Sequence, residues 1–174
     1  MVTQEYARFI EDFTKDVSIA FFDCDGTLSV PKYNVNGKYK VGMPASEWLP
    51  YNMQCDRVGL NSYHDCEPVK GEKFMYLLDK LKSENVGLNV LTQEYHSYAY
   101  FNKVDFITKY FGDYFKPRDI QFCCDAESKI EIMITYAKVH DLLPCEILFV
   151  DDRFDLCLKA ADAGLTVLHT SYFV

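Results

Sequence analysis

Two short acidic motifs carry the clearest chemical signal in the sequence. Asp23 and Asp25 follow one apolar run, and Asp151 and Asp152 follow another. Carboxylates held close together repel each other unless a cation neutralises them or one keeps a proton. Mg²⁺ prefers one or two carboxylates together with water and substrate phosphate. Either motif alone is explained as well by an acidic turn or by the start of a helix, but two motifs at one sheet edge favour a metal site.

A hydroxyl group and an ammonium group are the other candidates. Thr92 follows the apolar residues 88–91, and Lys129 lies near the start of a predicted helix. Taken singly, each is explained by a turn threonine or a solvated lysine. Lys138 lies deep in the same predicted helix and is the weaker candidate for a catalytic cation. Thr27, just after Asp25, is expected to hydrogen-bond back to its turn.

The elements that must position these residues alternate along the chain. Short apolar runs predict buried strands at 17–22, 88–91, 120–124, 147–150 and 165–168. Apolar residues at helical spacing predict helices at 1–16, 69–84, 98–110, 128–140 and 156–163. This alternation predicts an α/β fold with a parallel sheet covered on both faces. In such folds the active site lies at the carboxyl ends of the strands, where the candidate residues stand.

Length and composition indicate one globular domain spanning 1–174. Hydrophobic residues make up 49% of the chain and charged residues 25%, which excludes disorder for its bulk. The formal net charge is −8, so the chain lacks the basic footprint of a general nucleic-acid binder. No apolar run approaches the ~18 residues of a membrane span, and no membrane partner is expected. The sequence does not indicate the oligomeric state.

The cysteines and the first residues bear on the cellular compartment. The seven cysteines are odd in number, and none forms a C-x-x-C pair. The first residues lack a basic stretch followed by a long apolar run, so no secretory signal is expected. We therefore expect reduced thiols and a cytoplasmic protein.

The motifs together resemble those of the haloacid dehalogenase superfamily, in its phosphatase branch. In chain order, the four segments that resemble the family motifs are Phe21–Leu28, Thr92, Lys129 and Leu148–Asp152, the last in its double-aspartate form. They cover about 17–168 in the family order. The resemblance implies a parallel, Rossmann-like core with helices on both faces and a small lid inserted after the first strand.

The resemblance also implies a role for each catalytic residue. Asp23 is the nucleophile that forms an aspartyl-phosphate, and Asp25 is the general acid for the leaving group and then the base for water. Thr92 hydrogen-bonds the transferring phosphoryl group. Lys129 neutralises charge on the nucleophile and on the phosphoryl oxygens.

The cofactor implied by the resemblance is Mg²⁺. It would be held by Asp23, by the backbone carbonyl of Asp25, and by Asp151 and Asp152. Asp152 is favoured over Asp151 as the direct ligand. This arrangement is coherent, because phosphoryl transfer depends mainly on positioning and on charge neutralisation.

Residues 29–67 differ in character and fall where the family inserts its first type of cap. Glycine, proline and asparagine are frequent there, and we expect a small lid whose closure excludes water and selects the substrate. Its aromatic and basic side chains could line the pocket, although packing in the lid's own small core is favoured. These residues are Trp48, Tyr33, Tyr39, Tyr51, Tyr63, Lys32, Lys38, Lys40 and Arg57. The soft-metal ligands Cys55, His64 and Cys66 match no zinc spacing, and zinc is not favoured.

The predicted function is a Mg²⁺-dependent phosphatase that hydrolyses a small-molecule phosphomonoester. One alternative is a phosphoryl transferase or mutase, which would have to shield the acyl-phosphate from water. Another is a non-catalytic phosphate-binding regulatory module, whose usual sign is loss of Asp23 or Asp25, and both are present. A dehalogenase is disfavoured, because the second acid and the double aspartate suit a metal and phosphate. A nucleotide, a sugar phosphate or a phosphorylated small acid would each fit as substrate.

Overall fold

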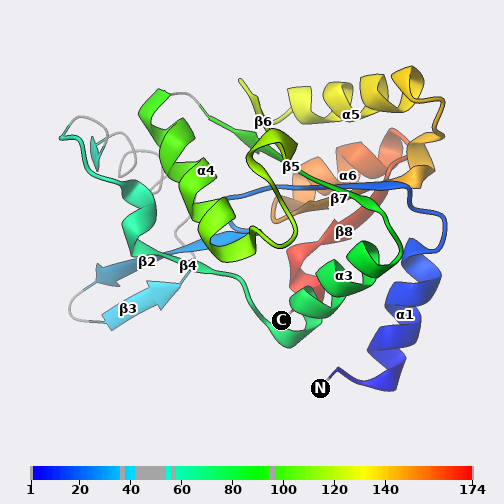
Figure 1. The fold of residues 1–174 in the computed structure, drawn as a ribbon, viewed down its shortest axis with the longest axis horizontal. Coiled ribbons are helices and arrows are strands. Elements are labelled where there is room, and N and C mark those ends of the chain that lie inside the picture. The colour runs from blue at the N-terminus through cyan, green and yellow to red at the C-terminus, as the bar shows by residue number, and fades with distance from the viewer. Residues whose placement is uncertain (1, 36–37, 42–53, 56–57, 95–96, 174) are drawn as a thin grey trace.

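A five-stranded parallel sheet forms the centre of the computed structural model, which describes residues 2–35, 38–41, 54–55, 58–94 and 97–173. The strand order is β6-β5-β1-β7-β8 (Figure 1). The strands are β1 (Ile19–Phe22), β5 (Gly87–Gln93), β6 (Ile120–Cys123), β7 (Ile147–Asp151) and β8 (Thr166–His169). Because β1 pairs with both β5 and β7, the carboxyl ends of these three strands lie side by side.

Helices cover both faces of this sheet, as predicted. The helices are α1 (Gln4–Thr14), α3 (Glu72–Ser83), α4 (Ser97–Phe111), α5 (Ser128–Val139) and α6 (Phe154–Asp162). In β1, Ala20 and Phe22 pack with α1, α3 and α4, whereas Ile19 and Phe21 pack with α5 and α6. Successive side chains of a strand point to opposite faces, so the uniformly apolar run of β1 supplies both cores. Short 3-10 helices are η2 (Pro117–Asp119), η3 (Pro144–Glu146) and η4 (Thr170–Phe173).

A second, smaller sheet lies beside the core and is built from the segment after β1 (Figure 1). Its strands are β2 (Ser29–Val35), β3 (Lys38–Val41) and β4 (Cys66–Pro68), and η1 (Ser62–Asp65) precedes β4. The antiparallel pairing of Ser29 with Pro68 brings the two ends of the predicted insert together. Trp48, Tyr51 and Arg57 lie outside the described residues, as do the side chains of 31–41. The lid function of this segment stays a prediction.

The first strand ends where the sequence predicts, at Phe22, so Asp23 and Asp25 both lie beyond the strand, in the segment that follows it. After Asp23 the chain wraps around the Cys24 carbonyl oxygen, which accepts the backbone N–H groups of Leu28 and Ser29, each over 2.8 Å. This tight loop turns Asp25 away from Asp23.

All seven cysteines are free thiols, and five of them are buried. None of the helices in the described parts of the chain has the length and apolar character that crossing a membrane requires.

Candidate active site

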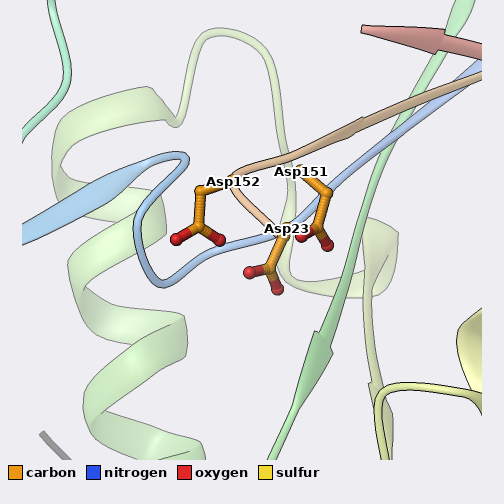
Figure 2. A group of neighbouring side chains, drawn as sticks. All are labelled: Asp23, Asp151 and Asp152. Carbon is orange, nitrogen blue, oxygen red and sulfur yellow. The ribbon is translucent and has the colours of Figure 1, made fainter. Parts of the chain in front are cut away.

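Three carboxylates converge at the carboxyl ends of β1 and β7. Asp23, Asp151 and Asp152 each place a carboxylate oxygen within 4.8 Å of the others. Figure 2 shows Asp23 on the chain that leaves β1 and the other two where β7 ends. The backbone of Asp23 is held against β7, because its N–H donates to the Val150 carbonyl oxygen over 2.9 Å. The sheet therefore brings together the two acidic motifs that lie far apart in the sequence.

Lys129 lies between two of these carboxylates. Its Nζ is 2.7 Å from Asp23 Oδ1 and 2.9 Å from Asp151 Oδ2, and the residue is only 2% exposed. Burial alone would lower the pKa of Lys129, but the charges of Asp23 and Asp151 raise it above its ordinary value. An ammonium group has three N–H donors, and among the described residues only two have acceptors. The third is available for an anionic ligand.

The two aspartates of the second motif differ in their partners. Asp151 is fully buried, and both its oxygens are occupied: Oδ2 by Lys129, and Oδ1 by the backbone N–H of Arg153 at 2.8 Å. Burial and the charge of Asp23 raise its pKa even so. Asp152 makes no ion pair among the described residues. Lost hydration, followed by the charges of Asp23 and Asp151, raises the pKa of Asp152 to about 7.

The Asp152 carboxylate occupies space that is free only because residue 26 is a glycine. A Cβ at position 26 would lie 2.2 Å from Asp152 Oδ2, far inside van der Waals contact, so only glycine leaves room for this carboxylate. The φ of Gly26 is also +83°, a backbone conformation that residues with a Cβ rarely adopt. Thr27 hydrogen-bonds back to the turn through its backbone, because its N–H donates to the Cys24 carbonyl oxygen over 3.2 Å. Its buried hydroxyl has no hydrogen-bond partner in the described parts of the chain.

Asp25 lies in a separate environment from the three clustered carboxylates. Lys103 donates to Asp25 Oδ2 over 2.8 Å, and the Tyr63 hydroxyl donates to Oδ1 over 2.6 Å. Ser29 makes a weaker contact of 3.4 Å with Oδ1. The Asp25 side chain remains 31% exposed and therefore accessible. Asp23 and Asp25 are thus paired with different lysines.

Sequence reasoning missed Lys103 altogether. It lies in α4, is 1% exposed, and is in line with the buried Phe106 and Ile107 three and four positions later. A lysine within the apolar stripe of a helix is the one signal that could have found it, because such a position faces the core. Tyr63 was considered for the pocket or for the insert's own core. Its hydroxyl reaches Asp25 in the site, and its ring packs against Phe106 of α4, with ring centroids 5.6 Å apart.

Lys103 also determines how Thr92 can hydrogen-bond. Its three N–H groups are taken by Asp25, by Thr92 Oγ1 at 3.1 Å and by the Gln93 carbonyl oxygen at 2.7 Å. An ammonium group can only donate, so the Thr92 oxygen accepts and its own O–H hydrogen is left to point elsewhere. Thr92 is fully buried within β5, at the sheet edge that carries the site. Its hydroxyl hydrogen is therefore available for donation.

Two other candidates are not part of this arrangement. Lys138 is exposed in the last turn of α5, so it does not replace Lys129. Among the described residues, Cys55, His64 and Cys66 do not form a group of converging metal ligands, whereas Asp23, Asp151 and Asp152 do.

The formal charge of the site is strongly negative. Five carboxylates, those of Asp23, Asp25, Glu94, Asp151 and Asp152, surround the ammonium groups of Lys103 and Lys129. When all are ionised, the carboxylates exceed the ammonium groups by three charges. A bound divalent cation would offset two of them, and such an ion is often the largest local charge in a site of this kind.

Comparison with known proteins gives a result at the level of the fold. No family model and no curated protein matches the sequence. A predicted phosphoglycolate phosphatase from Haemophilus somnus matches in structure with a TM-score of 0.55 and 15% identity, over 88% of this chain and 85% of that one. A haloacid dehalogenase-like hydrolase from Streptococcus pneumoniae matches with a TM-score of 0.54 and 15% identity, over 89% and 85%. The chain has the haloacid dehalogenase fold.

A third match includes ligands. A haloacid dehalogenase family enzyme from Bacteroides thetaiotaomicron, solved with magnesium and inorganic phosphate, has a TM-score of 0.50 and 15% identity over 88% of this chain and 93% of its own. In the haloacid dehalogenase fold of this chain, all four motif positions reach one edge of the sheet. At such low identity the likeness extends to the fold, and the chemistry follows from the side chains described above.

Proposed function

We propose that the protein is a Mg²⁺-dependent phosphohydrolase that cleaves a small-molecule phosphomonoester through an aspartyl-phosphate on Asp23. The observation that carries the proposal is the state of the Asp23 carboxylate. Oδ1 is held by Lys129, while Oδ2 has no hydrogen-bond partner among the described residues and lies in the carboxylate cluster. One oxygen is therefore oriented and the other is available to attack phosphorus.

The residues present fit a magnesium ion. Hard carboxylate oxygens within 4.8 Å of one another suit this ion, and the excess of negative charge requires a cation before a phosphate dianion can enter. Asp152 has oxygens to offer, whereas both oxygens of Asp151 are occupied. Asp23 Oδ1 keeps a second lone pair for the ion beside its contact with Lys129, which leaves Oδ2 for phosphorus. The geometry thus supports Asp152 as the direct ligand and Asp151 as the residue that holds Lys129. When bound, the ion supplies charge neutralisation on the phosphoryl oxygens.

In the first half of the proposed reaction, Asp23 Oδ2 attacks phosphorus and the bond to the leaving oxygen breaks. Asp25 passes a proton to that oxygen. The free N–H of Lys129 and the O–H of Thr92 donate to the phosphoryl oxygens, where negative charge has to be stabilised. In the second half, water attacks phosphorus, Asp25 takes its proton, and the bond from Asp23 to phosphorus breaks.

Two further observations support the proposal. The Bacteroides enzyme of the same fold holds magnesium and inorganic phosphate together. The segment 29–67 begins directly beside Asp25, and its residue Tyr63 contacts that carboxylate. We propose that this segment is a small lid over the site, which would select among phosphorylated small molecules.

A screen of phosphorylated metabolites with Mg²⁺, together with p-nitrophenyl phosphate, tests the function. We expect release of inorganic phosphate that a chelator abolishes and added Mg²⁺ restores. Full activity in excess chelator would contradict the metal assignment. Transfer of the phosphoryl group to an added alcohol in place of water would identify a transferase, and binding of phosphate without turnover of any ester would identify a non-catalytic module.

A further inference from the structure

The Asp25 carboxylate is held at both oxygens by side chains from two distant parts of the fold. Tyr63, in η1, donates to Oδ1 over 2.6 Å, and Lys103, in α4, donates to Oδ2 over 2.8 Å. The Lys103 ammonium also lies 5.9 Å from the centre of the Tyr63 ring, within cation–π range. The two donors contact each other as well as Asp25. We call Tyr63 and Lys103 the Asp25 clamp.

Both residues of the clamp are almost completely buried. Tyr63 is 4% exposed and packs against Phe106, and Lys103 is 1% exposed. Burying an ammonium group costs several kcal/mol, and a buried ion pair is weak evidence for a role in stability. An apolar side chain would fill the same place in α4 without that cost. The hydrogen bonds of Lys103 within the site therefore call for a functional explanation.

Neither clamp residue is placed to act on a phosphoryl group directly. All three N–H groups of Lys103 already have acceptors, and the Tyr63 hydrogen is directed at Asp25. A carboxylate has about four acceptor positions, so the clamp leaves Asp25 with positions that can exchange a proton. Because the Asp25 side chain is 31% exposed, that exchange can take place on its open side.

We propose that Tyr63 and Lys103 are positioning residues for proton transfer by Asp25, an inference that rests on the proposed phosphohydrolase function. They hold one free lone pair of Asp25 toward the leaving oxygen and then toward the attacking water. No bond to the clamp forms or breaks, and the transferred proton stays between Asp25 and the substrate or water. Lys103 additionally orients the Thr92 hydroxyl, so it links the proton-transfer group to a phosphoryl-binding group.

Tyr63→Phe is the decisive variant, because it removes the hydroxyl and keeps the buried ring. The measured quantity is kcat/KM, which covers the steps up to formation of the aspartyl-phosphate, for a series of aryl and alkyl phosphates. We expect about a tenfold loss for alkyl phosphates, which need a proton on the leaving oxygen. For p-nitrophenyl phosphate, whose leaving group departs as an anion, the loss should be under about twofold.

The chain offers a matched control. Tyr114 also donates its hydroxyl to an aspartate, Asp79 Oδ1 at 2.5 Å, but outside the site. Tyr114→Phe therefore removes the same type of hydrogen bond and should leave the dependence on the leaving group unchanged. A second test combines Tyr63→Phe with Asp25→Asn: if the hydroxyl acts only through Asp25, the double variant should be no slower than Asp25→Asn alone.

Lys103→Met tests the other half of the clamp. Like Tyr63→Phe, it should lower kcat/KM more for alkyl than for aryl phosphates. Unlike Tyr63→Phe, it should also weaken inhibition by inorganic phosphate about tenfold, because the Thr92 hydroxyl loses the ammonium group that orients it. If this variant fails to fold, the Tyr63→Phe result stands by itself. Equal losses for aryl and alkyl phosphates, or a further loss in the Asp25→Asn background, would overturn the clamp while leaving the phosphohydrolase intact. A wild-type protein that hydrolyses none of the esters would overturn both.

Discussion

Lys129 Nζ lies 2.7 Å from Asp23 Oδ1, in a site where both residues are buried. The same ammonium group contacts Asp151, so a single cation separates two carboxylates that would otherwise face each other. Lys129 therefore contributes both to the orientation of Asp23 and to the stability of the sheet edge.

Replacing Lys129 by methionine should destabilise the protein strongly. The substitution leaves Asp23 and Asp151 buried without their shared partner, and breaking a buried ion pair in this way typically costs about 3–5 kcal/mol. Denaturant titration measures the free energy of unfolding. Lys138→Met, on the exposed side of the same helix, is the control and should change it by less than ~0.5 kcal/mol. Similar effects for both variants would show that the Lys129 pairs contribute little.

Asp23 and Asp25 should respond differently to the same change to asparagine. Asp25→Asn keeps the backbone carbonyl and should bind Mg²⁺ nearly normally, with turnover reduced by about 10²–10⁴ and least for an activated leaving group. A beryllofluoride adduct, which mimics an aspartyl-phosphate, should form on Asp25→Asn and not on Asp23→Asn. Fluorine NMR detects it. An adduct on Asp23→Asn would mean that Asp23 is not the nucleophile.

Gly26→Ala should weaken metal binding as well as stability. The added Cβ would overlap the Asp152 carboxylate and force it from its place, in addition to the strain of a positive φ. Gly59→Ala separates the two effects, because Gly59 also has a positive φ of 70° but a Cβ there meets nothing within 4 Å. Isothermal titration with Mg²⁺ is the measurement. Unchanged affinity in Gly26→Ala would argue against Asp152 as a ligand.

The stabilisation by Mg²⁺ should grow as the pH rises. In the metal-free protein the pKa of Asp152 is raised from 3.8 to about 7 by lost hydration and by neighbouring acids. The folded state therefore holds a proton that the unfolded chain releases. This contribution to stability is complete below the unfolded pKa and is lost as the pH rises through about 7.

Thermal melts in chelator and in Mg²⁺ check this expectation. Mg²⁺ binding has to displace the proton of Asp152. The rise in melting temperature that Mg²⁺ causes should therefore be small near about pH 5 and large near about pH 8. Asp152→Asn should flatten the pH dependence of the metal-free protein. A shift that is independent of pH would show that Asp152 does not take part in this competition.

The sequence alone determined the layers of the fold and the order of the motifs. Continuous apolar runs such as 147–150 are strands buried on both faces, and the structure confirms the parallel sheet that they predict. The acidic residues that end these runs had to meet at the carboxyl edge, because parallel strands place those ends together. Asp23, Asp151 and Asp152 do meet there.

Only the tertiary structure decided which group pairs with which. Asp23 and Asp25, two residues apart, pair with different lysines, and the packing of α4 on the sheet brings Lys103 to Asp25 across 78 residues of sequence. Hydrogen bonds from Lys129 and Arg153 occupy Asp151 and leave Asp152 open. Local periodicity reports which face of an element is buried. A hydrogen bond depends on distances of a few tenths of an ångström between elements, and only their packing sets those distances.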